Sequence, residues 1–374
     1  MKISVITVCL NSGKTIEQTI QSVINQKNCN YEYIIIDGKS TDDTLEIIKK
    51  YRDRISVVVS EPDSGIYDAM NKGISLATGD VVGIINSDDW FEPGAFARVE
   101  KYFRDTDAEV VYGKMNAIDL EGNVQILIPS NIEKIRYEME TPHPTVFVKR
   151  EIYKKYGVFQ LKYKIAADYE LMLRLYTKGV KFKHLEYILA NFRMGGISAL
   201  QSETCAKETV EIASQYLPYA PLDKRQYFKD IIFHRKKAYL FDKLLNGSST
   251  AFCDILYKEL GVNDEDDIII FGSGNWGKKI HRILSYNKKC ILFFVDNDKT
   301  KWGGKVEQTK IVNPEILKSF KGVLLIAVEK FSEEISLQVS EWDNPYLYCI
   351  CWEEISERIL CIDNNLSRLP LERK

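Results

Sequence analysis

Residues 80–90 read Asp80-Val81-Val82-Gly83-Ile84-Ile85-Asn86-Ser87-Asp88-Asp89-Trp90, an apolar run that ends in two adjacent acids. Such a run, apolar at successive positions, is typical of a strand that is covered on both faces of a parallel sheet. Working outward, we expect further strands at 2–10, 31–36 and 55–59, and amphipathic helices at 15–26, from 41 onward and at 65–77. This alternation of strands and helices predicts an α/β fold with helices on both faces of the sheet.

Acidic side chains follow these predicted strands. Sheets of this kind bind ligands beyond the carboxyl ends of their strands, and the sequence places Asp37, Asp63, Asp88 and Asp89 there. Carboxylates at one edge repel one another unless a cation or the donors of a ligand compensate their charge. Mg²⁺ and Mn²⁺ bind few protein carboxylates and leave positions for phosphate oxygens. We therefore expect a cation and a phosphate-bearing ligand here. The alternative is that the acid pair caps a helix that begins near Pro93.

The composition excludes several classes of protein. The chain has 374 residues, and 51 Lys and Arg against 53 Asp and Glu give a net charge of −2. This near-neutral balance argues against a nucleic-acid partner. No apolar run approaches the roughly 20 residues of a membrane span, and the first residues lack a signal-peptide core, so we expect a cytoplasmic protein. The eight cysteines lack the spacing of a zinc site and are interpreted as reduced thiols.

The remainder of the chain changes character twice. After residue 91, antiparallel strands are expected at 110–118 and 124–129, followed by a helix at 168–178 and a strand at 181–191. The pattern from 200 to about 260 is helical, and a second alternation of strands and helices begins at 267. We therefore predict three parts: residues 1–198, a helical segment and linker at 199–263, and a second α/β domain at 264–374.

Four blocks within the first 90 residues resemble, in order, the N-terminal region of family 2 glycosyltransferases. They are residues 3–11, residues 32–42, the block Glu61-Pro62-Asp63-Ser64-Gly65-Ile66-Tyr67-Asp68-Ala69-Met70-Asn71-Lys72-Gly73, and Asn86-Ser87-Asp88-Asp89-Trp90. The resemblance implies a GT-A fold (the nucleotide-diphospho-sugar transferase fold) in residues 1–198. It also implies a nucleotide-diphosphate sugar and a divalent metal, Mn²⁺ or Mg²⁺, as ligands.

The same resemblance assigns residues to the donor site. The expected substrate-binding residues are Thr7, Cys9, Asn11, Asp37, Asp63, Lys72, Asp88 and Arg193. Residues 7–9 are expected to present backbone to the base, Asp37 to bind base or ribose, and Lys72 to contact the diphosphate. The family's Asp-x-Asp metal motif has Ser87 at its first position, so Asp88 is expected to face ribose or sugar and Asp89 to bind the metal. Asp88 remains a second candidate metal ligand.

The expected catalytic residue lies further along the chain. Asp168 begins an amphipathic helix that resembles the family's acceptor-side motif, with Ala167 in place of the usual Glu. A general base removes the proton of the attacking hydroxyl, and the resemblance gives Asp168 this role in an inverting transfer. Glu170 is the alternative base. Two further residues are left open: His143 as metal ligand, acceptor-site or packing residue, and Arg193 as phosphate contact or surface residue.

A second glycine loop begins the C-terminal part. Gly272-x-Gly274-x-x-Gly277 follows a predicted strand, and Asp296 lies 19 residues beyond Gly277. This spacing is typical of a dinucleotide-binding fold, so we expect a smaller Rossmann-like accessory domain with these four residues as weak candidates for binding NAD or another nucleotide. No Tyr-x-x-x-Lys pair for hydride transfer follows. A structural or nucleotide-binding module is therefore preferred to NAD chemistry.

These observations favour one function over two alternatives. The leading hypothesis is an inverting, metal-dependent, non-processive glycosyltransferase. It would move a sugar from a nucleotide-diphosphate sugar, most simply a UDP-sugar, to a hydroxyl of a glycan or lipid-linked acceptor. The expected role is surface-polysaccharide synthesis. The alternatives are a nucleotide-sugar oxidoreductase that uses the C-terminal fold and a non-catalytic nucleotide-sugar-binding scaffold. Peripheral contact with the inner face of the membrane and pairing of the 200–260 helices into an oligomer are left open.

Overall fold

The protein is described by a computed structural model that covers residues 1–196, 200–247, 249–287, 289 and 291–363, with backbone only at 361–363. The chain divides into two compact units, Met1–Ile232 and Phe233–Lys374. Each unit has its own sheet and is described by itself. The three-part division at 198 and 263 stays a prediction, and its first boundary lies outside the described residues.

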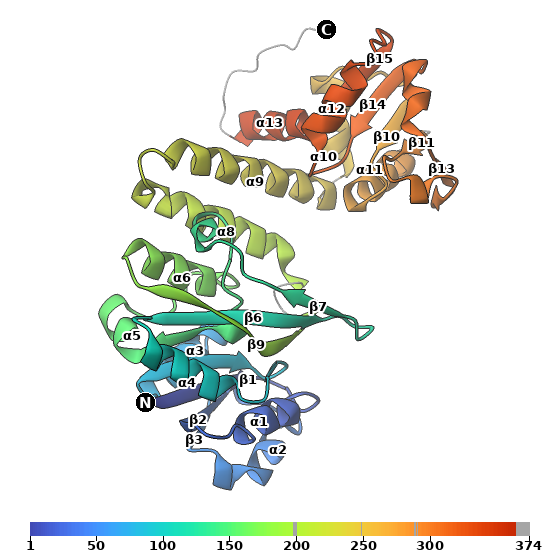
Figure 1. The fold of residues 1–374 in the computed structure, drawn as a ribbon. Helices are drawn as coiled ribbons and strands as arrows, with labels where there is room; N and C mark the ends of the chain where they lie inside the picture. The colour runs from blue at the N-terminus through green and yellow to red at the C-terminus, as the bar shows by residue number, and fades with distance from the viewer. Residues whose placement is uncertain (197–199, 248, 288, 290, 364–374) are drawn as a thin grey trace. The chain divides into compact units, whose positions relative to one another are not determined.

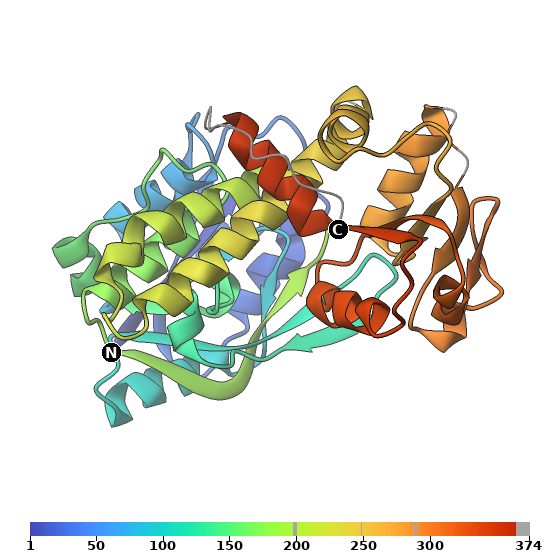
Figure 2. The same cartoon turned by 90° about the horizontal axis from the view of Figure 1, so that it is seen from above.

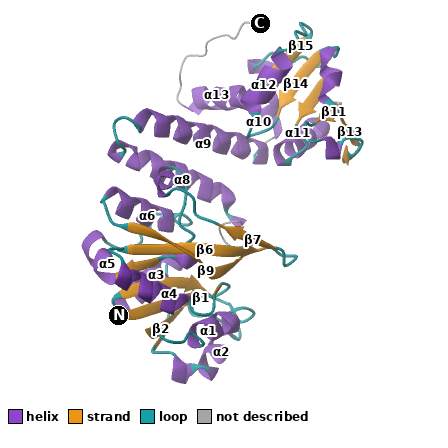
Figure 3. Ribbon diagram, in the orientation of Figure 1, coloured by secondary structure: helices purple, strands orange, loops and turns teal. Residues whose placement is uncertain are grey.

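A mixed, nine-stranded sheet forms the centre of the first unit (Figures 1 and 3). Its strands are β1 (Lys2–Cys9), β2 (Asn30–Asp37), β3 (Val57–Ser60), β4 (Val81–Asn86), β5 (Trp90–Phe91), β6 (Val110–Ile118), β7 (Val124–Leu127), β8 (Phe147–Lys149) and β9 (Phe182–Arg193). The order across the sheet is β3-β2-β1-β4-β8-β6-β9-β5, and β7 pairs with β6. The first four strands are parallel, and β8 runs antiparallel to both β4 and β6.

The register of the parallel strands aligns their carboxyl ends. Cys9 at the end of β1 lies opposite Asp37 at the end of β2, and Asp37 lies opposite Ser60 at the end of β3. On the other side of β1, Val8 lies opposite Asn86 at the end of β4. The segments that follow these strands therefore begin side by side, as the sequence predicts for the residues after each strand.

Helices cover both faces of this sheet: α1 (Ile16–Ile24), α2 (Thr44–Lys50), α3 (Ile66–Leu76), α4 (Ala95–Asp105), α5 (Arg150–Tyr156) and α6 (Ala167–Thr177). Helix α8 (Ser202–Tyr216) packs on α6, and the start of α9 (Arg225–Asn246), which crosses the boundary between the units, packs on α8. Alternate residues of β1 point to opposite faces. Ile6 and Val8 pack in one core with α3, α5 and α6, while Val5 and Cys9 pack in another with α1, α2 and α4.

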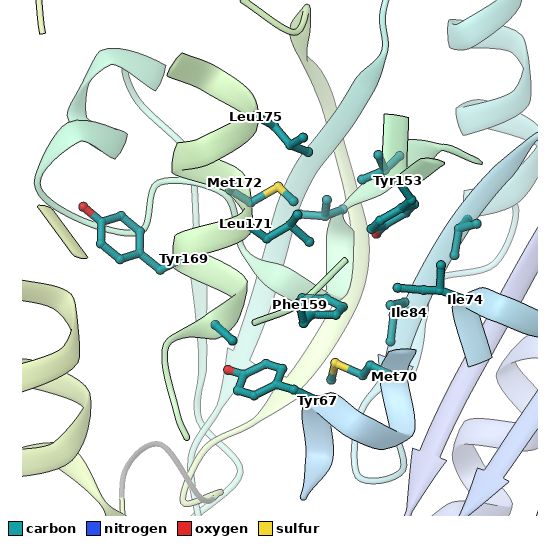
Figure 4. Packing of buried hydrophobic residues seen from close by; sticks show 14 of the residues in the cluster. Tyr67, Met70, Ile74, Ile84, Tyr153, Phe159, Tyr169, Leu171, Met172 and Leu175 are labelled. Atoms are coloured by element: carbon teal, nitrogen blue, oxygen red, sulfur yellow. The ribbon is translucent and has the colours of Figure 1, made fainter. Parts of the chain in front are cut away.

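The first of these cores includes α6, the helix that carries the candidate acceptor-side residue Asp168. Figure 4 shows side chains of α3, α5 and α6 gathered in one cluster, among them Tyr67, Met70 and Leu171. Helix α3 can approach β1 because a Cβ atom at Gly73 would lie 2.4 Å from Cγ2 of Ile6. Helix α8 packs along α6 (Figures 1 and 2). The start of α6 therefore lies within a packed set of helices.

The second unit contains a six-stranded sheet in the order β12-β13-β11-β10-β14-β15. Its elements are α10 (Ser249–Asp254), β10 (Ile268–Phe271), α11 (Asn275–Tyr286), β11 (Ile291–Val295), β12 (Lys305–Val306), β13 (Thr309–Val312), β14 (Gly322–Ile326), α12 (Ser332–Ser340), β15 (Leu347–Cys351) and α13 (Trp352–Asp363). Five of the strands are parallel, and β12 pairs antiparallel with β13. The unit is thus a second α/β sheet domain. None of the helices in the described ranges has the length and apolar character that crossing a membrane requires.

One helix boundary differs from expectation, and one alternative is excluded. The helix expected near Pro93 is α4, which begins at Ala95 after Gly94, whose φ is 77°; the acid pair does not cap it, because residues 90–91 form β5 in between. The helix expected from Thr41 begins at Thr44, because the Asp42 carboxylate accepts hydrogen bonds from Thr44 and from the backbone of Gly13. Neither Asp88 nor Asp89 is therefore explained as a helix cap.

We predict that Glu32 stabilises the start of the first sheet in a pH-dependent way. Its buried carboxylate accepts hydrogen bonds from the side chains of Lys2 (2.6 Å) and Ser4 (2.5 Å) and from the backbone N–H of Thr78 (2.6 Å). Burial alone would raise the pKa of Glu32, but these bonds outweigh it and lower the pKa from 4.5 to about 2. The ionised form is therefore favoured in the folded state by ~3 kcal/mol above pH 5.

This contribution should disappear as the pH falls from about 4.5 toward 2. Denaturant unfolding of Glu32→Gln should show a free energy of unfolding lower than that of the wild type by about 2–3 kcal/mol at pH 7, with the difference shrinking in acid. Glu121→Gln, which removes an exposed glutamate from the turn between β6 and β7, is the control. A difference that is constant with pH would contradict the prediction.

Candidate active site

Asp37 ends β2 at the expected edge, and its carboxylate is fully buried. Oδ1 accepts a hydrogen bond from the Ser40 hydroxyl at 2.5 Å, and Oδ2 accepts from the Ser40 backbone N–H at 3.1 Å and the Ser60 hydroxyl at 2.6 Å. The thiol of Cys9 lies 3.6 Å from Oδ1. Burial and the negative charge of Asp37 raise the pKa of Cys9. Both side chains are thus engaged within the fold, and their contact with a base or ribose stays a prediction.

Thr7 lies in β1, and Asn11 lies in the loop that follows this strand. Asn11 is exposed with a φ of 50°, and its Oδ1 accepts a hydrogen bond from the backbone N–H of Thr41 at 2.9 Å. Thr7 is buried in β1, where its hydroxyl lies 3.0 Å from that of Tyr33. Of these two residues, only Asn11 presents a side chain at the surface of the edge.

Asp63 and Lys72 belong to one connected segment after β3. Asp63 Oδ1 accepts a hydrogen bond from the backbone N–H of Gly65 at 2.9 Å, at the turn into α3. The Lys72 ammonium lies 3.0 Å from Glu61 Oε1 and donates to the carbonyl of Pro62 at 2.8 Å. The hydrogen bond to Glu61 raises the pKa of Lys72, which stays charged. Lys72 therefore holds residues 61–62 against α3, and a ligand phosphate would compete with Glu61 for it.

The acid pair after β4 is the least compensated part of the site. Asp89 is fully buried, and Oδ1 accepts a hydrogen bond from the backbone N–H of Arg193 at 3.0 Å. Its Oδ2 has no hydrogen-bond partner among the described residues. Burial, and then the charge of Asp88, raise the pKa of Asp89 well above its usual value; burial also raises the pKa of Asp88. A buried carboxylate with an unpaired oxygen is costly unless it is protonated or bound to a cation.

Arg193 at the end of β9 lies over this pair. Its Nε donates to the backbone carbonyl of Asp88 at 3.3 Å, its Nη2 donates to Gln18 Oε1 at 2.9 Å, and its guanidinium lies 5.2 Å from the centre of the Trp90 ring. The structure thus brings Arg193 to the acids, although 104 residues separate it from Asp89. Its guanidinium supplies positive charge at the edge where a phosphate is expected.

The acid pair fits a divalent cation through its chemistry. Mg²⁺ and Mn²⁺ accept one or two protein carboxylates and complete their coordination with water and phosphate oxygens. Asp89 Oδ2 is an unpaired oxygen of the required kind, and Asp88 lies next to it in the chain. No group of three or more His, Cys, Asp and Glu side chains in the described residues has a metal-binding arrangement. We therefore consider a metal site with two protein ligands, Asp88 and Asp89.

Asp168 lies in the first turn of α6, partly exposed, with its carboxylate next to a tyrosine of α3. The Tyr67 hydroxyl is 3.1 Å from Asp168 Oδ1 and 2.5 Å from the carbonyl oxygen of Ile165, and the backbone N–H of Tyr169 donates to the same Oδ1 at 2.9 Å. The motif that begins at Glu61 therefore contacts the acceptor-side motif through Tyr67. No pattern in the sequence singles out Tyr67 for a role.

Glu170 has a different environment from Asp168 and is not available as a base. It is fully buried and forms an ion pair with Arg174 at 3.0 Å. Its Oε1 also accepts hydrogen bonds from Gln160 at 2.9 Å and from the Tyr216 hydroxyl at 2.5 Å. Because these partners satisfy the carboxylate, Glu170 fastens α6 to its neighbours.

His143 lies near Asp168 in a mainly apolar setting. Its ring is 6.2 Å from that of Phe159, and its buried Nε2 has no hydrogen-bond partner among the described residues. Burial lowers the pKa of His143, and the charge of Asp168 opposes this. The imidazole is therefore neutral at pH 7. Its role as metal ligand or acceptor-site residue stays a prediction.

The second glycine loop has the expected backbone conformation. Its candidate nucleotide-binding acid, Asp296, is however already hydrogen-bonded within the fold. Gly272 has a φ of 102°, and a Cβ atom at Gly277 would lie 1.9 Å from the Gly272 carbonyl oxygen, so α11 can start only with glycine there. A Cβ atom at Gly274 would meet nothing within 4 Å. Asp296 Oδ2 accepts hydrogen bonds from the Ser273 hydroxyl at 2.6 Å and from Lys301 at 3.0 Å.

These contacts also determine the ionisation of Asp296. Burial would raise its pKa, but the hydrogen bonds, that of the Ser273 hydroxyl first, hold the pKa below its usual value. Asp296 thus closes the glycine loop as an ionised carboxylate, and a ribose hydroxyl would have to displace Ser273 or Lys301. Nucleotide binding in this unit remains a prediction.

Comparison with known proteins identifies the class of the first unit. The glycosyl transferase family 2 model matches residues 4–172, and a model described as C2185-like, N-terminal, matches residues 264–345. An uncharacterized glycosyltransferase of Mycobacterium tuberculosis is 32% identical over 185 residues, which are 46% of this chain and 68% of that protein. The chain is thus an enzyme of glycosyl transfer, and it belongs to glycosyltransferase family 2.

Longer relatives and solved structures agree with this. The chondroitin synthase of Pasteurella multocida is 28% identical over 316 residues, 79% of this chain but 32% of that protein. Residues 1–349 of S. aureus TarS, solved in complex with UDP-GlcNAc, superpose with a TM-score of 0.53 at 19% identity, covering 68% of this chain and 83% of that one. The first unit has the GT-A fold, as the sequence predicts.

We predict that Asp89 destabilises the folded protein when no divalent cation is present. An acid whose pKa is raised on folding holds its proton longer in the folded state, so folding stability falls as the pH rises above about 4. Asp89→Asn keeps the acceptor for the Arg193 N–H without the charge. In EDTA it should unfold at higher denaturant than the wild type, with a difference that grows with pH.

The control for this measurement is Asp53→Asn, which removes an exposed acid from the same unit. It should leave the unfolding midpoint unchanged. A wild type that is as stable as Asp89→Asn at every pH would contradict the picture of an uncompensated carboxylate.

Proposed function

We propose that the protein transfers single sugars, with inversion, from a UDP-sugar to a hydroxyl of a glycan or lipid-linked acceptor in surface-polysaccharide synthesis. The observation that carries the proposal is the contact between Tyr67 and Asp168. It joins the helix that follows the donor-side segment to the carboxylate expected to activate the acceptor. Both reactants of a glycosyl transfer would then be bound by neighbouring elements of one fold.

The donor assignment draws on the strand edge and on the relatives. Asn11, Asp63, Lys72, Asp88 and Arg193 would face the nucleotide diphosphate, with Thr7, Cys9 and Asp37 supporting the base from beneath. The TarS structures were solved with UDP-GlcNAc and with UDP. The Pasteurella relatives are named as chondroitin and hyaluronan synthases, which supports a glycan acceptor.

Asp168 would act as the base of this transfer. Its carboxylate takes the proton from the acceptor hydroxyl while that oxygen attacks the anomeric carbon from the face opposite the diphosphate. The bond from that carbon to the diphosphate oxygen breaks, UDP leaves, and the configuration inverts. The Arg193 guanidinium stabilises the charge that develops on the diphosphate. Asp89, with Asp88, would hold Mn²⁺ or Mg²⁺, which when bound offsets part of the same charge.

The two alternatives from the sequence have less support. The family model that matches residues 4–172 and the named relatives are glycosyltransferases, so a nucleotide-sugar oxidoreductase is not favoured. A non-catalytic scaffold would have no use for a carboxylate at Asp168. A cytoplasmic location at the inner face of the membrane, peripheral membrane contact and an oligomer through α8 and α9 stay predictions.

The expected result for Asp168→Asn is a loss of sugar transfer with donor binding retained. Removing a general base lowers rates by about 10²–10⁴-fold, and the amide keeps the size and the acceptor for the Tyr67 hydroxyl. Release of UDP from UDP-GlcNAc with Mn²⁺ measures turnover, and calorimetric titration with UDP measures donor binding.

Asp223→Asn, an exposed acid of the same unit, serves as the control and should keep the wild-type rate. An Asp168→Asn protein with wild-type turnover would remove Asp168 from the mechanism. Loss of UDP binding in the same variant would assign it to the donor site instead.

A further inference from the structure

Helix α6 begins without a capping side chain of its own. Its N-cap residue is Ala166, followed by Ala167, and no side-chain cap hydrogen bond is formed there. The first backbone N–H groups of a helix have no acceptors within the helix and need partners from elsewhere. This requirement matters here because Asp168 lies in the first turn, so whatever binds these groups also fixes the position of its carboxylate.

Glu208 of α8 binds the N-cap residue of α6 and the two residues before it. Its Oε1 accepts a hydrogen bond from the backbone N–H of Lys164 at 2.8 Å, and its Oε2 accepts from those of Ile165 and Ala166 at 2.9 Å each. The side chain is buried, with 7% of its surface exposed. A carboxylate at a helix N-terminus is also favoured by the helix dipole. One side chain thus binds three successive N–H groups directly before Asp168.

The hydroxyl of Tyr67, a residue of α3, contacts the same turn. Its buried hydroxyl lies 2.5 Å from the carbonyl oxygen of Ile165 and 3.1 Å from Asp168 Oδ1. Ile165 is therefore bound at its N–H by α8 and at its carbonyl by α3. Burial and the charge of Asp168 raise the pKa of Tyr67, so its hydroxyl remains a donor at neutral pH.

We propose that Glu208 and Tyr67 are positioning residues for the catalytic carboxylate: together they clamp residues 164–166 and so fix Asp168 relative to the acceptor hydroxyl. The inference rests on the proposed function, because it assumes that Asp168 is the base. It makes α8, which lies beyond the residues that match the family model, part of the catalytic machinery. A displacement of about 1 Å in a reacting group can cost about 10²-fold in rate.

The clamp can be loosened without unfolding α6. The body of the helix is fastened independently by the buried Glu170–Arg174 pair and by the Tyr216 hydroxyl. Arg174 also donates to the carbonyls of Tyr156 and Val158. Substitutions at Glu208 or Tyr67 should therefore disturb the first turn and leave the remainder in place.

The test uses the full chain with the variants Glu208→Gln, Glu208→Ala and Tyr67→Phe. Matched controls are Glu211→Gln, an exposed acid of the same helix, and Tyr163→Phe, whose hydroxyl contacts Gln215 and not the turn. With UDP-GlcNAc and Mn²⁺, we expect kcat for UDP release to fall about 10- to 100-fold in Tyr67→Phe and Glu208→Gln, and further in Glu208→Ala. The KM for UDP-GlcNAc and the Kd for UDP should stay within about two-fold of the wild type. Both controls should keep the wild-type kcat.

The outcomes separate this inference from the proposed function. If Asp168→Asn loses turnover while all three clamp variants keep kcat, Asp168 remains the base and the clamp is wrong. If Asp168→Asn keeps turnover, Asp168 is not the base, and the proposed clamp is wrong as well. A loss of kcat that is matched by lost UDP binding or by a lower unfolding midpoint would show general disruption and would also overturn the clamp.

Discussion

The parallel register of the first strands is the constraint on which the site depends. Because β1 pairs with both β2 and β4 without a shift, their carboxyl ends and the polar residues that follow them meet at one edge. The acids at this edge are compensated unequally. Asp37 is satisfied by serine donors, whereas the buried Oδ2 of Asp89 has no hydrogen-bond partner in the part of the chain that the structure describes. The unfavourable negative charge is therefore concentrated where a bound cation would compensate it.

Surroundings rather than residue type decide which carboxylates of α6 and α8 can take part in chemistry. Glu170 is buried against Arg174 and Tyr216, and Glu208 is used by three backbone N–H groups. Within the described ranges, Asp168 Oδ1 contacts only a tyrosine hydroxyl and one backbone N–H, and the side chain is partly exposed. The two glutamates thus hold the helix in place, and the aspartate keeps lone pairs free for a proton.

Much of the fold follows from the sequence because the signals are local. Apolar runs and amphipathic spacing predict the alternation in residues 1–90, and the hairpin of β6 and β7 surrounds its predicted turn. The parallel pairing of β6 with β9 could not be predicted, since the two strands are distant in the chain. The same holds for Ser60, which donates to Asp37 from 23 residues away, and for Glu208, which lies 42 residues from Ala166. The uncapped Ala166-Ala167 start was the one local sign that a partner was missing.

In the proposed site, the acids after β4 hold a divalent cation and, through it, the nucleotide diphosphate. Calorimetric titration of the full chain with UDP, with and without Mn²⁺, tests it most directly. We expect UDP to bind at least about tenfold more tightly with Mn²⁺ than without it. This gain in affinity should be lost in Asp89→Asn. Equal UDP affinity with and without the cation, or an enhancement that survives in Asp89→Asn, would contradict it.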